Sequence, residues 1–279
     1  MEVEEVSPKL TETFQEGYMQ VVDRSPENPK SEIPVILSPG WSENPKVFKD
    51  AIQVFLNSGR RVIAFNFPGI RNSTRETSYP NLEVGKAETI LELMRTKGIK
   101  KADVVCHSEG SIGPIIAASL EPDKFRNLIL VGPAGFIGKD SFPKLAGRFS
   151  VKTLTDPHRL LGGDKPMRPF FRYLKEGIKF AFRHPIQGLE EAMAISQVQL
   201  EDTLQELHNN GVGIAIVSGV NDPVFPMKRL QKIVKRNMID GFVSVAGGHD
   251  EIHLQPKYAR AAEQLITNLE NKQKNNPTS

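Results

Sequence analysis

Short β-branched runs alternate with longer helical patterns from residue 33 onward, and this alternation constrains the fold more than any other feature of the chain. Strands that alternate with helices in this way form βαβ units, in which helices cover both faces of a parallel sheet. The strand patterns lie at residues 33–37, 61–65, 102–106, 128–131, 212–217 and 242–245. The helical patterns lie at residues 45–57, 82–97, 110–120, 228–235 and 257–269. The sequence therefore predicts an α/β fold with a mostly parallel central sheet, and residues 15–24 are expected to add antiparallel strands at one edge.

The spacing of apolar residues supports the helical pattern at residues 82–97. Apolar residues recur there at the three- and four-residue spacing of an amphipathic helix. They are Val84, Ala87, Ile90, Leu91 and Met94.

The alternation stops between about residues 136 and 205, where prolines and a glycine pair interrupt the helical stretches and no strand pattern occurs. A chain of 279 residues can hold one large α/β core with an insertion. We therefore predict a core formed by residues 1–135 and 206–279, and a helical cap, or lid, formed by residues 136–205.

The composition excludes several classes of protein. The net charge is +3, far from the concentrated basic charge of a nucleic-acid-binding protein. Cys106 is the only cysteine, so a disulfide framework and a cysteine-rich metal site are excluded. The acidic first residues lack the apolar run of a signal peptide, and no stretch reaches the ~18 apolar residues that span a bilayer. We expect a soluble cytoplasmic protein that binds neither nucleic acid nor metal.

Ser108 lies in the segment Cys106-His107-Ser108-Glu109-Gly110, between a predicted strand and a predicted helix. A serine on such a sharp strand-to-helix turn exposes its hydroxyl above the sheet, and small residues two places before and after it allow close backbone approach. A serine before a glycine is also a common helix cap. The strand before Ser108 and the helix after it favour the nucleophile, and we predict that role for Ser108.

Two later loops offer the groups that such a nucleophile needs. A serine hydroxyl requires a base nearby, and a carboxylate must hold that base in one tautomer. Asp222 follows the strand pattern at 212–217, and His249 follows the pattern at 242–245. Loops after parallel strands meet at the carboxyl edge of the sheet, where ligands bind. The sequence therefore predicts His249 as the general base and Asp222 as the acid that orients it.

Other residues compete for these two roles. Asp240 and Asp250 are alternatives for the acid, and His253 and His107 are alternatives for the base. The glycine pair before His249 favours that histidine, and His107 is expected to pack against the sheet.

With these motifs in the chain order Ser, Asp, His, the sequence resembles the α/β-hydrolase superfamily over roughly residues 15–270. The segment that runs from Ser38 to Trp41 resembles the family's oxyanion loop. The resemblance implies that the backbone N–H groups of Trp41 and Glu109 form the oxyanion hole. Two positions depart from the family: Pro39 stands where a histidine is usual, and Cys106 replaces the first glycine of the nucleophile turn.

The predicted cap carries a basic stripe opposite an apolar one between Met167 and Arg183. The favoured interpretation is that the apolar stripe covers the active site while the basic stripe faces water. The alternative is peripheral contact with an anionic membrane through the basic stripe. The basic stripe consists of Arg168, Arg172, Lys175, Lys179 and Arg183. The predicted substrate pocket is lined by Phe136, Phe171, Leu174 and Val224.

These features together predict a serine hydrolase that cleaves a carboxylic ester with an apolar acyl chain through an acyl-enzyme, as esterases and lipases do. The partner is then a small-molecule ester, and no cofactor is expected. The same triad could cleave an amide, a thioester or a carbon–carbon bond next to a ketone, because one fold hosts many chemistries. The alternative from a different class is a ligand-binding protein that retains the fold without turnover.

Overall fold

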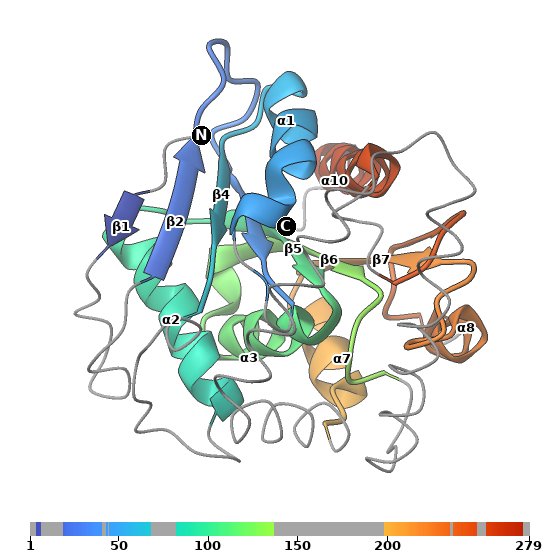
Figure 1. Ribbon diagram of the computed structural model, residues 1–279. Coiled ribbons are helices and arrows are strands. Elements are labelled where there is room, and N and C mark those ends of the chain that lie inside the picture. The colour runs from blue at the N-terminus through green and yellow to red at the C-terminus, as the bar shows by residue number, and fades with distance from the viewer. Residues whose placement is uncertain are drawn as a thin grey trace, which may run out of the picture.

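The computed structural model describes residues 4–6, 19–40, 43, 45–67, 82–136, 198–234, 237–249 and 255–275. Within these residues a single eight-stranded sheet forms the centre of the molecule, in the order β1-β2-β4-β3-β5-β6-β7-β8 (Figure 1). Its strands are β1 (Glu4–Val6), β2 (Met19–Arg24), β3 (Val35–Ser38), β4 (Val62–Phe65), β5 (Ala102–His107), β6 (Phe125–Val131), β7 (Gly213–Gly219) and β8 (Gly241–Val245).

The direction of the strands confirms the predicted fold class. β1 pairs antiparallel with β2, and β2 pairs antiparallel with β4, whereas all other pairs are parallel. The antiparallel strands therefore lie at one edge, as the pattern at 15–24 indicated. β3 lies between β4 and β5, so the chain passes to one side of β3 and then to the other. In open α/β sheets, ligands bind beyond the strand ends at such a reversal.

Helices cover both faces of the sheet (Figure 1). One face carries α1 (Lys49–Asn57), which follows the short 3₁₀ turn η1 (Pro45–Phe48), and α10 (Pro256–Asn275). The other face carries α2 (Leu82–Thr96), α3 (Ile112–Leu120), α7 (Glu201–Asn209) and α8 (Met227–Val234). Successive strand residues point to opposite faces, so Ile36 joins one buried cluster and its neighbours Val35 and Leu37 join the other. None of the described helices is long and apolar enough to cross a bilayer.

The observed elements differ from the predicted ranges at several ends. Residues 108–111 form a 3₁₀ turn, η2 (Ser108–Ser111), before α3 begins at Ile112. A second 3₁₀ turn, η3 (Pro122–Lys124), leads into β6. α10 continues to Asn275, beyond the predicted end at 269. α7 spans the predicted boundary at 205/206 and buries Leu204 and Leu207. Residues 137–197, which hold most of the predicted cap, lie outside the described residues.

One of the apolar positions of α2, Val84, is not buried. This side chain is 43% exposed, whereas Glu83 and Lys86 are buried at 6% and 3%. Ala87, Ile90, Leu91 and Met94 lie in the core. Spacing alone assigns charged residues to the solvent side, but a charge can be buried when a partner of opposite charge meets it. Lys86 has such a partner next to the proposed nucleophile.

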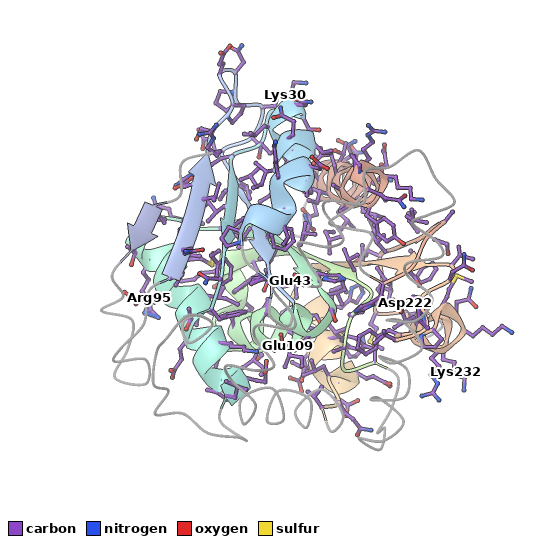
Figure 2. All side chains as sticks on the ribbon, viewed as in Figure 1. Lys30, Glu43, Arg95, Glu109, Asp222 and Lys232 are labelled. Carbon is purple, nitrogen blue, oxygen red and sulfur yellow. The ribbon has the colours of Figure 1, made fainter. Side chains whose placement is uncertain are left out.

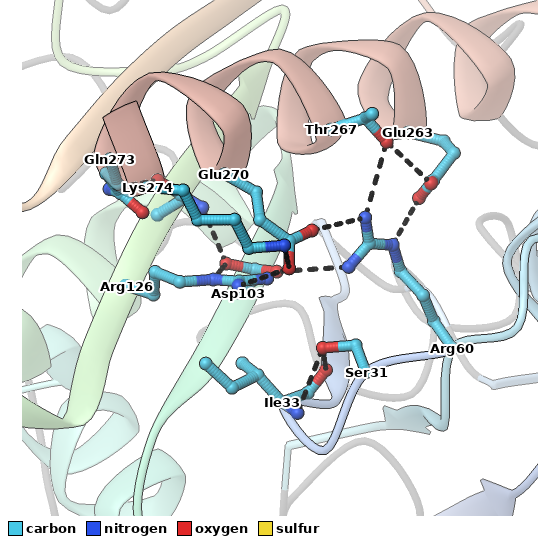
Figure 3. Close-up of polar contacts among 11 residues, drawn as sticks. Ser31, Ile33, Arg60, Asp103, Arg126, Glu263, Thr267, Glu270, Gln273 and Lys274 are labelled. Atoms are coloured by element: carbon cyan, nitrogen blue, oxygen red, sulfur yellow. Dashed lines mark hydrogen bonds and ion pairs between the residues drawn. The ribbon is translucent and has the colours of Figure 1, made fainter. Parts of the chain in front are cut away.

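A buried charge network joins α10 to the amino ends of β4, β5 and β6 (Figure 3). Asp103 is fully buried, and both of its carboxylate oxygens accept hydrogen bonds from Arg126. Arg60 donates from Nε to Glu263 at 2.8 Å and from Nη2 to Glu270 at 3.2 Å. The network therefore fixes the C-terminal helix to the edge of the sheet that lies opposite the loops of Ser108, Asp222 and His249.

Replacing Asp103 with alanine is expected to lower the free energy of unfolding by ~3–5 kcal/mol, because Arg126 would keep a buried charge without its main partner. Chemical denaturation measures this loss. The matched control is Lys274→Ala, which removes a 68% exposed side chain that lies 3.4 Å from Glu270 in the same network. That change should cost less than ~1 kcal/mol. Equal losses in the two variants would contradict the assignment of stability to the buried part of the network.

Candidate active site

Ser108 lies on a strained turn at the carboxyl end of β5. Its φ of 55° is in the left-handed region, which residues other than glycine rarely adopt. The turn packs tightly against the loop after β3, because a Cβ on Gly110 would lie 2.1 Å from the carbonyl oxygen of Pro39. Ser111 Oγ and the backbone N–H of Ala134 both donate to the Ser108 carbonyl, at 2.7 and 3.1 Å. These contacts hold the turn and present the Ser108 hydroxyl above the strand end.

His249 joins Ser108 to Asp222 through its two ring nitrogens. Nε2 of His249 lies 2.8 Å from Ser108 Oγ, and Nδ1 lies 2.8 Å from Asp222 Oδ2. All three residues are buried, at 5%, 3% and 6% exposure. The structure thus brings together residues that are 141 and 27 positions apart in the sequence. Both distances suit hydrogen bonds.

The loop after β7 fixes the orientation of the Asp222 carboxylate. Its second oxygen, Oδ1, accepts backbone hydrogen bonds from Val224 at 2.8 Å and Phe225 at 3.0 Å. The same loop pairs with the loop of His249, since the backbone N–H of Asn221 donates to the Gly247 carbonyl at 3.0 Å. Oδ2 is therefore the oxygen directed at His249.

Gly132, which follows β6, leaves room for this pair. It has a φ of 50°, and a Cβ at this position would lie 3.0 Å from Asp222 Oδ2 and 3.2 Å from His249 Nδ1. A side chain would therefore press on the hydrogen bond between the acid and the imidazole. The Gly-Pro pair that closes this strand in the sequence thus has a role at the site as well as in the turn.

A second group of charges is buried next to the Ser108 turn. Lys86 Nζ forms a short ion pair with Glu109 Oε1 and lies 3.2 Å from Glu83 Oε1. One lysine therefore faces two carboxylates. Burial raises the pKa of Glu109 to about 8; the charge of Lys86 acts against this rise, and the charge of Glu83 adds to it. In Figure 2, Glu43 and Glu109 are labelled one below the other near the middle of the view, and Asp222 is labelled to their right.

This pKa predicts how stability depends on pH. Between 4.5, the ordinary pKa of a glutamate, and about 8, the two buried carboxyl groups of Glu109 and Glu83 hold one proton between them in the folded protein, because Lys86 balances the charge of only one of them. The unfolded chain has released this proton. The free energy of unfolding should therefore fall as the pH rises through this range. Glu109→Gln should flatten that dependence, so that the variant gains stability relative to the wild type at high pH. Denaturation at pH values below, within and above the range tests this, and identical slopes would contradict it.

The sequence pattern of the α/β hydrolase fold family matches residues 33–255, which is well over half of the chain. The chain belongs to the α/β hydrolase fold family. This confirms the resemblance drawn from the Ser108, Asp222 and His249 loops. A search of curated proteins found no match.

Solved structures similar to this α/β hydrolase include two esterases. One, from Exiguobacterium antarcticum, has 18% identity and a TM-score of 0.68 over 91% of this chain and 96% of its own. The other, a carboxylesterase from Nitrososphaera gargenis, has 18% identity and a TM-score of 0.68 over 98% and 100%. A bromoperoxidase from Bacillus anthracis has 15% identity and a TM-score of 0.68 over 95% and 100%. At these identities, the likeness shows the fold alone.

The remaining residues predicted for the site of this α/β hydrolase fall into two groups. Phe136 and Val224 are buried at 1% and 0% exposure and belong to one hydrophobic cluster. Trp41, Phe171, Leu174, Asp250 and His253 lie outside the described residues. The backbone of Glu109 is described, directly after Ser108 in η2.

Two competing residues have other contacts in this α/β hydrolase. Asp240 accepts a hydrogen bond from the backbone N–H of Ile214 at 3.1 Å, at the amino end of β7, so it lies at the wrong edge of the sheet to orient His249. His107 directs its ring nitrogens to Glu43 and to the carbonyl of His249. Cys106 is fully buried, and burial raises the pKa of its thiol far above the ordinary value.

Sequence reasoning missed Glu43 and Lys86. Both are charged residues, and both are buried, at 2% and 3% exposure. The position of Glu43 three residues after Gly40, in the loop that resembles the oxyanion loop, was the signal available for it. For Lys86, the available signal was Glu83, which lies three residues before it on the same predicted helix; its contact with Glu109, 23 residues away, could not be read from local spacing.

Proposed function

We propose that this protein is a serine hydrolase with Ser108 as nucleophile, His249 as general base and Asp222 as the acid that orients the imidazole. One observation carries the proposal: a continuous line of two 2.8 Å contacts runs from Ser108 Oγ through His249 to Asp222 Oδ2. A histidine held by a carboxylate on one nitrogen and by a serine hydroxyl on the other is the arrangement that activates serine.

The proposed reaction is acyl transfer in two steps. His249 removes the Ser108 proton as Oγ attacks the substrate carbonyl, and the protonated imidazole then gives this proton to the leaving group. The backbone N–H groups of Trp41 and Glu109 hold the oxyanion. A water molecule, deprotonated by His249, attacks the acyl-enzyme and releases the acid. Asp222 stays ionised and stabilises the imidazolium.

The proposed substrate is a carboxylic ester with an apolar acyl chain. Two considerations support this class: the similar solved structures include esterases, and the apolar ring of Phe225 lies 5.2 Å from that of His249. Turnover of p-nitrophenyl esters of graded chain length tests the proposal. Matched amides and thioesters in the same assay separate the alternative reactions, and labelling of Ser108 by a fluorophosphonate separates an enzyme from a ligand-binding protein.

The basic stripe of the cap leads to a further prediction about membranes. We expect the apolar stripe between 167 and 183 to cover the pocket, so the wild type should not bind anionic vesicles, and Phe171→Ala should change chain-length preference. Co-sedimentation with vesicles at low and high salt measures this. If the stripe instead meets a membrane, each basic residue contributes on the order of 1 kcal/mol, and salt weakens the binding. Salt-sensitive binding that is lost in Arg172→Glu would therefore contradict the covering role.

The single cysteine also bears on the compartment. Cys106 is buried and unpaired, which suits a reducing environment. We therefore place the protein in the cytoplasm as part of this proposal.

A further inference from the structure

Glu43 and His107 form a buried carboxyl–imidazole pair beside the proposed triad. Glu43 Oε1 lies 2.8 Å from His107 Nδ1, and each side chain is 1% exposed. The other oxygen, Oε2, accepts a hydrogen bond from the backbone N–H of Gly40 at 2.6 Å. The other nitrogen of His107, Nε2, lies 2.9 Å from the backbone carbonyl of His249. The pair therefore forms a bridge between the loop after β3 and the loop after β8.

The positions of the protons in this bridge follow from its acceptors. A carbonyl oxygen only accepts, so His107 Nε2 must carry a proton and donate it to His249. One further proton lies between His107 Nδ1 and Glu43 Oε1. The Gly40 N–H is the donor at Oε2. Both carboxylate oxygens of Glu43 and both ring nitrogens of His107 thus have a protein partner, which is what a buried polar network needs to hold one geometry.

Both ends of the bridge reach groups that the proposed reaction uses. Gly40 directly precedes Trp41, whose backbone N–H is proposed for the oxyanion hole. The carbonyl at the other end belongs to His249 itself, whose ring centroid is 5.0 Å from that of His107. The sequence has Pro39 where the family usually has a histidine, so the ordinary polar side chain is missing from this loop. Glu43 and His107 supply a polar connection at this place.

We propose, building on the proposed function, that Glu43 and His107 are positioning residues, and that their bridge from Gly40 to the His249 carbonyl aligns the oxyanion loop with the general base. Neither side chain exchanges a proton with the substrate. They act through the backbone, in the way that a supporting shell fixes the groups in direct contact with substrate. A shift of about 1 Å in such groups can cost ~10²-fold in rate.

Two replacements of similar size at position 43 test the bridge. In Glu43→Gln, the amide oxygen can accept from the Gly40 N–H while the amide NH₂ donates to Nδ1 of a neutral His107, so all three contacts persist. In Glu43→Leu, both contacts of the side chain are lost. We expect kcat for a short p-nitrophenyl ester to fall ~10²-fold in the leucine variant with little change in KM. The glutamine variant should stay within about threefold of the wild-type kcat.

A double mutant separates positioning from a general loss of stability. His107→Phe breaks the same bridge from its other end, so its effect should match that of Glu43→Leu, and the two together should cost no more than either alone. Rates are measured where circular dichroism finds each variant folded. If Glu43→Leu does not fold, Glu43→Asp replaces it, since its shorter side chain reaches only one of the two partners. This variant should lose about tenfold in kcat.

Three outcomes would overturn the proposal. They are a wild-type kcat in folded Glu43→Leu or His107→Phe, a glutamine variant as slow as the leucine variant, and additive losses in the double mutant. Failure of the proposed function is distinguishable, because ¹H–¹⁵N spectra of the histidine rings need no substrate. If the wild type hydrolyses no ester, these spectra must still show a proton on His107 Nε2 in the wild type and in Glu43→Gln. The signal of His107 Nδ1 should change in Glu43→Leu, because this nitrogen loses its contact with the carboxyl group.

Discussion

Replacing Ser108 with alanine is expected to lower kcat for ester hydrolysis by ~10⁴-fold or more, because Oγ is the atom proposed to form the acyl-enzyme. The fold should persist: alanine strains the turn at a φ of 55° no more than serine does, and the hydrogen bonds to the Ser108 carbonyl use the backbone. The measurement is kcat for a p-nitrophenyl ester, with thermal unfolding recorded beside it.

Ser119→Ala is the matched control for this variant. Ser119 lies on α3, the helix after the turn, and its exposed hydroxyl bonds only to the Ile116 carbonyl at 2.8 Å. The Ser119→Ala variant should have the activity and melting temperature of the wild type. Wild-type turnover in Ser108→Ala would remove Ser108 from the proposed mechanism, whatever the control gives.

Asp222→Asn is expected to cost ~10²- to 10⁴-fold in kcat, although the site keeps its shape. The reason lies in the two backbone donors of Val224 and Phe225, which require an oxygen at the position of Oδ1. The asparagine must therefore direct its NH₂ group toward His249 Nδ1. That nitrogen then becomes an acceptor, the ring proton moves to Nε2, and Nε2 can no longer remove the Ser108 proton.

The control for this prediction is Asp240→Asn, the same chemical change at the carboxylate that lies at the opposite end of β7. Because Asp240 contacts Ile214, Lys272 and His208 at the edge of the sheet opposite His249, this variant should keep the wild-type kcat at temperatures where it is folded. A wild-type rate in Asp222→Asn would assign the acid elsewhere, and Asp250 would be the first residue to test. The two variants thus distinguish the loss of the carboxylate that contacts His249 from the loss of a carboxylate at the other edge of the sheet.

The two predictions depend on different parts of the site. Ser108→Ala removes the atom proposed to react, whereas Asp222→Asn replaces one carboxylate oxygen by a nitrogen of similar size and thereby changes which nitrogen of His249 carries the proton. The expected loss in Ser108→Ala would support covalent catalysis. The expected loss in Asp222→Asn would separately support the role of Asp222 in fixing the tautomer of His249. Residues that act as one unit give losses that do not add, so the double variant should be no slower than Ser108→Ala.

The sequence by itself determined the features that depend on neighbouring residues. The alternation of strand and helix patterns predicted the parallel sheet, because the side-chain periods of strands and helices are read over a few consecutive positions. The loops of Ser108, Asp222 and His249 were found for the same reason, since each directly follows a strand. Parallel strands end at one edge, so the meeting of these three residues followed from topology.

Tertiary structure alone decided which charged residues are buried. Glu43 lies 64 positions from His107, and His107 lies 142 positions from the carbonyl that it contacts. No local pattern connects such residues. The burial of Lys86 and the exposure of Val84 have the same origin, because a charge leaves water only where a distant partner compensates for the lost solvation. The periodicity of a helix shows which of its faces is more apolar. Ion pairs with other segments can nevertheless bury charged residues that periodicity assigns to the solvent side.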